Sequence, residues 1–552
     1  MKDRQTKVDT LRCTSRVTRP DRIAVVGTGV AGLTMLRSLR MHLPDAEVVA
    51  MNRTTTVRGC WGDPPAEFVS TSTRYATQLA NFVQYEAVVT GDADDPSDFF
   101  RGGEFGDYLD AFADHFDLRS LIEMSTEVLR VRPHVDGGWS VTSRRDGRTP
   151  VVRRFDAVII CGGSTPRIND MASIDDDRVI RPAAAADLRD ASVMVLGGGE
   201  SAVDLAVKLS RPSRNNRVGL SLRRGIRVSP RYHPIGGVPS DYLRTRRMEG
   251  IRPGWRSAIG ERFVRFRITR RRWLERWYPS RRPAGRNDRD TESRRVADRW
   301  AERLRRHAAG GLFDVYHNKS EEFLKAVGDG RLSILGPPIN ATDGRWWNFE
   351  RTRPVAFDAD AIVPAIGRRP VWPDLIGPEG GTTGGIVGGI DRFRWGMEYR
   401  DRPGLYLVGA VRPIIGNVPT LTEVQAEWVA RRLSGSADDV DFGDDRRPRP
   451  RPMQPNDEAT TTLAVEMFPY CDALARSIGM WPPIDRSERR RYAWEPATTR
   501  HYAWPKIPPP DPAPRYLPRS LAAAITVIAM LDQATRRRQP SPVPLARIST
   551  TR

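Results

Sequence analysis

The stretch DRIAVVGTGVAG, residues 21–32, decides the fold of this 552-residue chain. Its short apolar run, residues 23–26, predicts a strand that is buried on both faces. The run is followed by Gly27, Gly29 and Gly32, and then by apolar residues with helical spacing. In this pattern the first glycine permits a tight turn, the second lets the backbone approach a pyrophosphate, and the third lets the helix pack on the strand. We therefore predict a parallel sheet with the phosphates of a dinucleotide at the start of that helix.

A second apolar strand is expected at residues 47–51, about 20 residues after the glycine turn, where this kind of fold places a residue that binds the ribose. Asn52 stands there instead of the usual Asp or Glu. We predict Asn52 as a ribose-binding residue.

The glycine pattern occurs a second time, and this repeat is the strongest observation in the sequence. A predicted strand at residues 192–196 leads into GGGESA, which places Gly197, Gly199 and Ala202 at the three positions. Two phosphate loops in one chain favour a flavoprotein with two nucleotides over a dehydrogenase with a single cofactor.

Two arginines follow the next predicted strand, residues 218–222. Arg223 and Arg224 stand where a 2′-phosphate would lie, and the guanidinium fork matches the geometry of a phosphate group. The second nucleotide is therefore predicted to be NADPH rather than NADH.

Composition narrows the class of protein. The chain has no apolar run of 18 residues, so a membrane-spanning helix is not expected. The apolar segment 521–531 is too short to span, and a core helix is favoured there over a membrane-surface contact. The first 20 residues carry no apolar signal region, and the four cysteines lack CxxC or metal-ligand spacing, which together favour a cytoplasmic location and no disulfide framework or zinc site.

The net charge of +20 could indicate nucleic acid, an acidic membrane surface or anionic ligands as partners. The basic residues are nearly all arginines and are spread along the chain, with a dense patch at residues 262–306. No nucleic-acid motif accompanies them, so we favour solvated helix faces and anionic cofactor sites. The seven histidines show no metal spacing, and no metal site is expected.

The remaining periodic segments predict an α/β chain with many elements. Helices are expected at residues 104–118, within 262–306, and at 319–327, 421–433 and 467–478; strands are expected at 126–131, 139–142, within 155–163, at 331–335, within 357–367 and within 403–411.

Further motifs lie between and after the two loops. They are RGCW at residues 58–61, LRRGIRVSPRYHPIGGVPSDYLRTR from residue 222, AIG at 365–367, NVPTLTEVQAEWVA at 417–430 and YCDALARSIGMWPPI from residue 470. With GTGVAG and GGGESA, and in this order, they make residues 22–516 resemble the flavin-containing monooxygenases. That class of FAD- and NADPH-dependent enzymes includes amine N-hydroxylases and Baeyer–Villiger enzymes.

The resemblance implies two Rossmann-like domains, one for FAD and one for NADPH, with the FAD domain discontinuous in sequence and a mostly helical C-terminal region. It implies Trp61, Gly367 and Gly409 as further cofactor-binding residues. The expected division is a disordered arm (1–20), the first part of the FAD domain (21–168), the NADPH domain with an Arg/Trp-rich insertion (169–356), the second part of the FAD domain (357–436) and a C-terminal extension (437–552).

The resemblance also implies the chemistry: NADPH reduces FAD, and a C4a-hydroperoxyflavin gives one oxygen atom of O2 to a small-molecule substrate. N-hydroxylation of a small amine or amino acid is favoured. Oxygenation of sulfur or of a ketone by the same machinery, and a reductase that makes no oxygenated product, stay open. The family motif FxGxxxHxxxY and its Baeyer–Villiger form would fall near residues 179–188 and are absent, which counts against a Baeyer–Villiger enzyme.

Arginines suggest the kind of substrate. Arg74 stands where the family keeps an active-site Asn, and a charge beside the flavin is costly unless it faces an anion. Arg412, in GAVRP, is a second candidate and the patch at residues 289–295 a third. We expect Arg74 and Arg412 to act at the catalytic centre on a substrate that could carry a carboxylate, in a chain that binds no nucleic acid and could form a homo-oligomer.

Overall fold

The structure is a computed structural model. It describes residues 19–62, 64, 68–79, 82, 99–166, 177–232, 239–243, 245–277, 288–308, 317–377, 389–414, 416–438, 440, 451–452 and 463–480. The expectations for the N-terminal arm, for Cys13, for the apolar segment 521–531 and for most of the C-terminal extension lie outside these residues.

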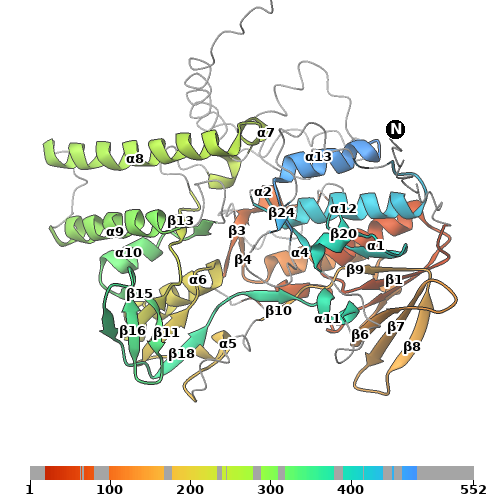
Figure 1. The fold of residues 1–552 in the computed structure, drawn as a ribbon, viewed down its shortest axis with the longest axis horizontal. Coiled ribbons are helices and arrows are strands. Elements are labelled where there is room, and N and C mark those ends of the chain that lie inside the picture. The colour runs from red at the N-terminus through yellow and green to blue at the C-terminus, as the bar shows by residue number, and fades with distance from the viewer. Residues whose placement is uncertain are drawn as a thin grey trace, which may run out of the picture.

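The first sheet has seven strands and unites three distant parts of the sequence (Figure 1). Its order is β20-β21-β22-β9-β1-β2-β5, and the five strands from β22 to β5 run parallel. The strands are β1 (Arg22–Val26), β2 (Glu47–Met51), β5 (Ile122–Glu123), β9 (Ala157–Ile160), β20 (Phe393–Arg394), β21 (Glu398–Tyr399) and β22 (Leu405–Leu407). The strand expected at residues 23–26 is confirmed within β1, and β2 has the expected bounds.

A layered group of four helices packs on this sheet through α1. α1 (Val30–His42) packs on α12 (Val418–Leu433), and α13 (Met467–Ser477) packs on the other side of α12. α12 is buried along nearly its whole length, since it lies between two helices. α4 (Glu104–His115) also contacts α1, so the helices expected around residues 104–118, 421–433 and 467–478 are confirmed with slightly different ends.

The second sheet has six strands in the order β17-β16-β15-β12-β11-β18, of which β15, β12, β11 and β18 are parallel. They are β11 (Ser192–Leu196), β12 (Arg217–Ser221), β15 (Leu332–Asn340), β16 (Arg345–Asn348), β17 (Pro354–Ala356) and β18 (Ala361–Pro364). The expected boundary at residue 357 is wrong for β18. This strand pairs with β11, so the second sheet continues to Pro364 before the chain returns to the first.

Helices α6 (Glu200–Leu209) and α10 (Phe323–Gly328) pack on the second sheet. The Arg/Trp-rich insertion forms α8 (Pro253–Trp277) and α9 (Asp288–Arg306), which Figure 1 shows side by side at the edge of the molecule. An ion pair between Glu261 of α8 and Arg305 of α9 joins them. The insertion is helical, as predicted.

Two expected elements have different bounds. The helix expected at residues 319–327 begins only at Phe323, because Lys319 ends the strand β14 (His317–Lys319). The strand expected within residues 403–411 ends at Leu407, and Val411 begins β23 (Val411–Pro413) of another sheet.

Smaller sheets join the larger elements. They are β3 (Val69–Thr73) with β4 (Phe99–Arg101); β6 (Thr126–Pro133), β7 (Trp139–Arg145) and β8 (Val151–Phe155); β10 (Ser164–Pro166) with β19 (Arg368–Pro370); β13 (Arg227–Ser229) with β14; and β23 with β25 (Leu463–Val465) and β24 (Arg451–Pro452). Short helical segments are α2 (Arg74–Thr77), α5 (Pro182–Ala185), α7 (Arg246–Glu249), α11 (Trp372–Ile376), η1 (Gly59–Trp61), η2 (Arg119–Leu121), η4 (Pro212–Arg214), η5 (Ser240–Leu243) and η7 (Ile390–Arg392).

The strands β10 and β19 connect the two large sheets. β10 lies where the chain leaves the first sheet after β9, and β19 lies where it leaves the second after β18. The two strands pair antiparallel, with Ser164 opposite Pro370. Among the residues that the structure describes, no helix is both long and apolar enough to cross a membrane.

Candidate functional site

The first glycine loop lies at the carboxyl end of β1. A Cβ atom at Gly32 would come within 2.0 Å of the carbonyl oxygen of Gly27, so only glycine lets α1 approach the turn this closely. Gly29 forms the N-cap of α1. The three predicted glycines therefore lie at the junction of strand and helix.

Both glycine loops end at helix N-termini that lack side-chain caps. Gly29 caps α1 and Gly199 caps α6, and neither cap position has a side-chain hydrogen bond. In contrast, Thr73 caps α2 and Asn417 caps α12 with side-chain oxygens. The first N–H groups of α1 and α6 can therefore donate to a ligand, and phosphate groups suit such a position.

The second loop has free space beside Gly199, at the N-terminus of α6. A Cβ atom at Gly199 would have no neighbour within 4 Å, whereas one at Gly197 would lie 2.3 Å from the carbonyl oxygen of Ala365. Ala202 is fully buried in α6. The second loop thus packs against the AIG segment behind it, of which Gly367 is the last residue, and leaves space for a nucleotide before the helix.

The RGCW segment lies against the first loop. A Cβ atom at Gly59 would come within 2.9 Å of the Cα atom of Gly29, so the two backbones are in direct contact. Trp61 is half-buried and meets Phe68 and Phe105 edge-on, with ring centroids 5.5 and 5.0 Å apart. The structure therefore brings the predicted residue Trp61 to the start of α1.

Gly409 also lies near this loop. A Cβ atom there would be 3.3 Å from the Cβ atom of Ala31 in α1, and the N–H group of Gly409 donates to Oε1 of Gln425 at 3.0 Å. Gly409 thus connects β22, α1 and α12 at the carboxyl end of the first sheet.

Asn52 follows β2 and is 7% exposed. Its amide nitrogen donates to the carbonyl oxygens of Thr54 at 3.0 Å and Thr56 at 2.7 Å, which fixes the loop that follows. A carboxylate could not donate these bonds. The Asn at this position therefore has a structural use, and its role in binding a ribose stays a prediction.

Arg74 begins α2 and forms an ion pair inside the chain. Its Nη2 atom lies 2.6 Å from Oε2 of Glu104, its Nε atom donates to the carbonyl oxygen of Phe99 at 3.0 Å, and its guanidinium lies over the ring of Phe100. Glu104 is the anion that this partly buried cation needs. The argument that Arg74 requires an anionic substrate is therefore no longer needed.

Arg412 has a different setting. It lies on β23 with an exposed side chain, close to Cys60 of the RGCW segment. Cys60 is exposed at the surface; desolvation by neighbouring atoms raises the pKa of its thiol, and the positive charges of Arg368 and Arg412 partly offset this rise. Arg412 is thus placed next to the first loop. The third arginine group, at residues 289–295, lies on α9, where the exposed Arg295 pairs with Glu292.

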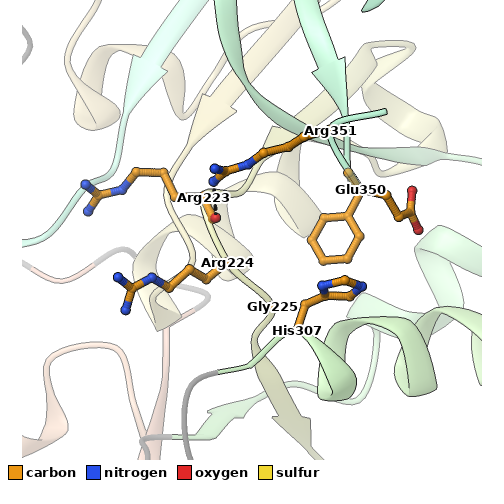
Figure 2. Close-up of a pocket in the computed structure, with 7 residues that line it drawn as sticks. Arg223, Arg224, Gly225, His307, Glu350 and Arg351 are labelled. Atoms are coloured by element: carbon orange, nitrogen blue, oxygen red, sulfur yellow. Dashed lines mark hydrogen bonds between the residues drawn. The ribbon is translucent and has the colours of Figure 1, made fainter. Parts of the chain in front are cut away.

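A pocket of about 260 Å³ lies beyond the carboxyl end of β12 (Figure 2). The residues that line it are Arg223, Arg224, Gly225, His307, Phe349, Glu350 and Arg351. The two arginines predicted for a 2′-phosphate thus lie in one pocket. His307, Phe349 and Arg351 were not predicted, because they come from the end of α9 and from the turn between β16 and β17, far away in the sequence.

The end of α9 is held against this pocket. The N–H group of Gly225 donates to the carbonyl oxygen of His307 at 2.9 Å. A Cβ atom at Gly225 would lie 2.0 Å from the carbonyl oxygen of Leu304. Glycine at this position therefore lets the insertion contact the loop that carries Arg223 and Arg224.

No cluster of three or more His, Cys, Asp or Glu side chains with metal-ligand geometry occurs in the part of the chain that the structure describes. The described residues do provide the uncapped N-termini of α1 and α6, which could receive phosphate groups, and the arginine-lined pocket.

Comparison with known proteins shows a family resemblance over the first half of the chain. Residues 20–278 match the model of the family described as flavin-binding monooxygenase-like. This region is therefore similar to the flavin-binding monooxygenase-like family. Within the whole chain, 41% aligns with dimethylaniline monooxygenase [N-oxide-forming] 4 of Oryctolagus cuniculus, at 31% identity over 247 residues. The chain thus spans 42% of the length of that monooxygenase.

Solved structures of monooxygenases share the fold. S-allyl-L-cysteine S-oxygenase from Allium sativum is 17% identical with a TM-score of 0.50, and the alignment covers 86% of this chain and 92% of that one. A mutant of cyclohexanone monooxygenase from Rhodococcus sp. Phi1, bound to NADP+, is 14% identical with a TM-score of 0.52, over 83% and 97%. The predicted α/β fold with two Rossmann-like units is confirmed.

Proposed function

We propose that the chain is an FAD- and NADPH-dependent monooxygenase that transfers one oxygen atom of O2 to the nitrogen of a small amine or amino acid. The observation that carries this proposal is the pair of uncapped helix N-termini, at Gly29 and Gly199, each at the carboxyl end of the parallel strands of its own sheet. When bound, FAD would supply the oxygen chemistry and NADPH the hydride.

The first loop is the proposed FAD site and the second the proposed NADPH site. FAD would be held by Gly27, Gly29, Gly32, Asn52, Trp61 and Gly409, and NADPH by Gly197, Gly199, Ala202, Arg223, Arg224 and, from the segment behind the second loop, Gly367. The arginine pocket favours the nucleotide with the additional phosphate, since guanidinium groups pair with phosphate through two parallel hydrogen bonds.

Nitrogen is the proposed target for two reasons. The relative at 31% identity is named for forming N-oxides. Arg412, exposed beside the RGCW segment, could bind the carboxylate of an amino acid while its amine lies near the flavin. Arg74 is already paired with Glu104, so the proposal for a carboxylate partner rests on Arg412.

The test uses the flavin-loaded protein, NADPH and ¹⁸O₂ with a panel of amino acids and the amines that correspond to them without the carboxylate. N-hydroxylated products that carry one ¹⁸O atom support the proposal. Oxygenated sulfur or ester products would instead establish sulfur or Baeyer–Villiger oxygenation. NADPH oxidation that yields only hydrogen peroxide with every substrate would mean a reductase, and a protein that binds no flavin would overturn all of these functions.

The variant Arg412→Gln tests the carboxylate partner. Loss of a charged hydrogen bond should raise KM for an amino acid by about tenfold or more, and should leave KM for the matching amine unchanged. Arg74→Gln is the comparison, because it should lower stability without this selective effect. Equal KM changes for amino acid and amine in Arg412→Gln would exclude a carboxylate contact.

A further inference from the structure

We infer that Arg351 is a third arginine of the NADPH site and that it contributes to discrimination between NADPH and NADH through the 2′-phosphate. This inference rests on the proposed function, because it assumes that the second loop binds the dinucleotide. It adds a residue from a distant turn, between β16 and β17, to the two arginines that follow β12.

The charge of the pocket points to an anion. Three of the lining residues are arginines, and the single carboxylate among them, Glu350, is already paired: Nε of Arg303 donates to its Oε1 atom at 2.7 Å. The negative charge of Glu350 is thus balanced by Arg303, which does not line the pocket. A doubly charged phosphate group would offset most of the positive charge of the three arginines, whereas the neutral 2′-hydroxyl of NADH would not.

The guanidinium of Arg351 is fixed in place by the loop it faces. Its Nη2 atom donates to the backbone carbonyl oxygen of Arg223 at 2.5 Å. A guanidinium has five N–H donors, so this bond leaves others for a ligand. In Figure 2 the three guanidinium groups, those of Arg223, Arg224 and Arg351, extend toward the same side of the pocket. A phosphate there would meet donors from two separate elements.

The backbone of Arg351 supports the same conclusion. Its φ angle is +59°, in the left-handed region that favours glycine. An arginine at this position costs conformational energy that a glycine would avoid. Such a residue is a candidate for a functional role when its side chain lies in a pocket.

The experiment compares two ligands that differ only by the phosphate in question: adenosine 2′,5′-bisphosphate and adenosine 5′-monophosphate. Binding to the flavin-loaded protein is measured by calorimetry, which needs no turnover. The test variant is Arg351→Gly, since glycine removes the guanidinium and also suits the positive φ, so the turn is not destabilised. The control is Arg353→Ala, an exposed arginine two residues away that does not line the pocket.

Arg351→Gly should weaken binding of the bisphosphate by about tenfold or more and leave binding of the monophosphate within about twofold of the parent protein. Arg353→Ala should change neither. A bisphosphate affinity that is unchanged in Arg351→Gly, in a parent protein that prefers the bisphosphate, would overturn the role of Arg351 and leave the proposed function intact. A parent protein that binds neither ligand would overturn both.

Discussion

Replacing Glu249 with Gln should remove a pH dependence from the stability of this protein. Glu249 ends α7, is 5% exposed, and accepts a hydrogen bond from the backbone N–H group of Phe468 in α13 at 3.1 Å. The pKa of Glu249 is raised from 4.5 to about 8, mainly because the carboxyl group is buried, and the negative charge of Glu466 adds to this rise. The hydrogen bond from the N–H group of Phe468 and the positive charges of Arg256 and Arg246 partly offset it. This carboxyl group is therefore neutral in the folded protein at neutral pH.

The sign of the effect follows from proton binding. Between pH 4.5 and about 8 the unfolded chain has released the proton of Glu249 while the folded chain still holds it. The free energy of unfolding must then fall as the pH rises, by at most about 1.4 kcal/mol for each pH unit. From pH 5.5 to 7.5 this single group should lower the free energy of unfolding by roughly 3 kcal/mol, and above pH 8 it should cause no further decrease.

The assay is urea unfolding of the parent protein and of Glu249→Gln at pH 5.5, 6.5, 7.5 and 8.5. Glutamine has the shape of the neutral acid and its carbonyl oxygen can still accept from Phe468, so the variant should gain stability relative to the parent as the pH rises. Glu292→Gln, which removes an exposed carboxylate from α9, should follow the parent. If the curves of Glu249→Gln and the parent run parallel between pH 5.5 and 7.5, Glu249 is not a buried neutral acid.

Three further substitutions test the loops and their support. Gly29→Val should abolish FAD retention, because the branched side chain would press on η1 and enter the phosphate space, whereas Gly29→Ala, with its Cβ atom 3.4 Å from the nearest atom, should retain more flavin; a yellow Gly29→Val protein would contradict this. Gly225→Ala should displace the end of α9 and weaken binding of adenosine 2′,5′-bisphosphate, while Gly254→Ala in open space should not; equal affinities would refute the coupling. Asp241 and Lys319 form an ion pair in which each side chain is 4% exposed. Asp241→Ala should lower the free energy of unfolding by about 3 to 5 kcal/mol, because Lys319 then loses its buried carboxylate partner. Recovery of stability on adding Lys319→Met would support this cause, and a loss below about 1 kcal/mol in Asp241→Ala would exclude it.

The sequence predicted the parallel strands well, because each is a short apolar run that ends at a glycine or a polar residue. Residues 47–51 and 192–196 have the same bounds in the structure as in the prediction. Such runs are buried on both faces, so their own composition carries the signal. The partner of each strand is not encoded locally, and the strand at residues 361–364 was therefore assigned to the wrong sheet.

The arginines show the same limit for the site. Arg223 and Arg224 could be predicted because they directly follow a strand of a recognisable motif. The sequence around Arg74 gave no indication that Glu104, thirty residues later, would neutralise it. Arg351 stands in a polar turn 128 residues from Arg223, and only the folded chain brings the two together. Motifs that bind through the backbone are local, whereas pairs of charges depend on the whole fold.

The ribbon formed by β10 and β19 carries the chain out to the second sheet and back, and its mechanical behaviour follows from its hydrogen bonds. Sliding one strand along the other would break every bond of the ladder, whereas twisting or bending the ribbon keeps them all. The two sheets can therefore turn relative to each other but cannot easily shift along the ribbon axis. Any rotation of one sheet against the other about this ribbon would change the orientation of one glycine loop relative to the other, while the length of the tether between them stays constant.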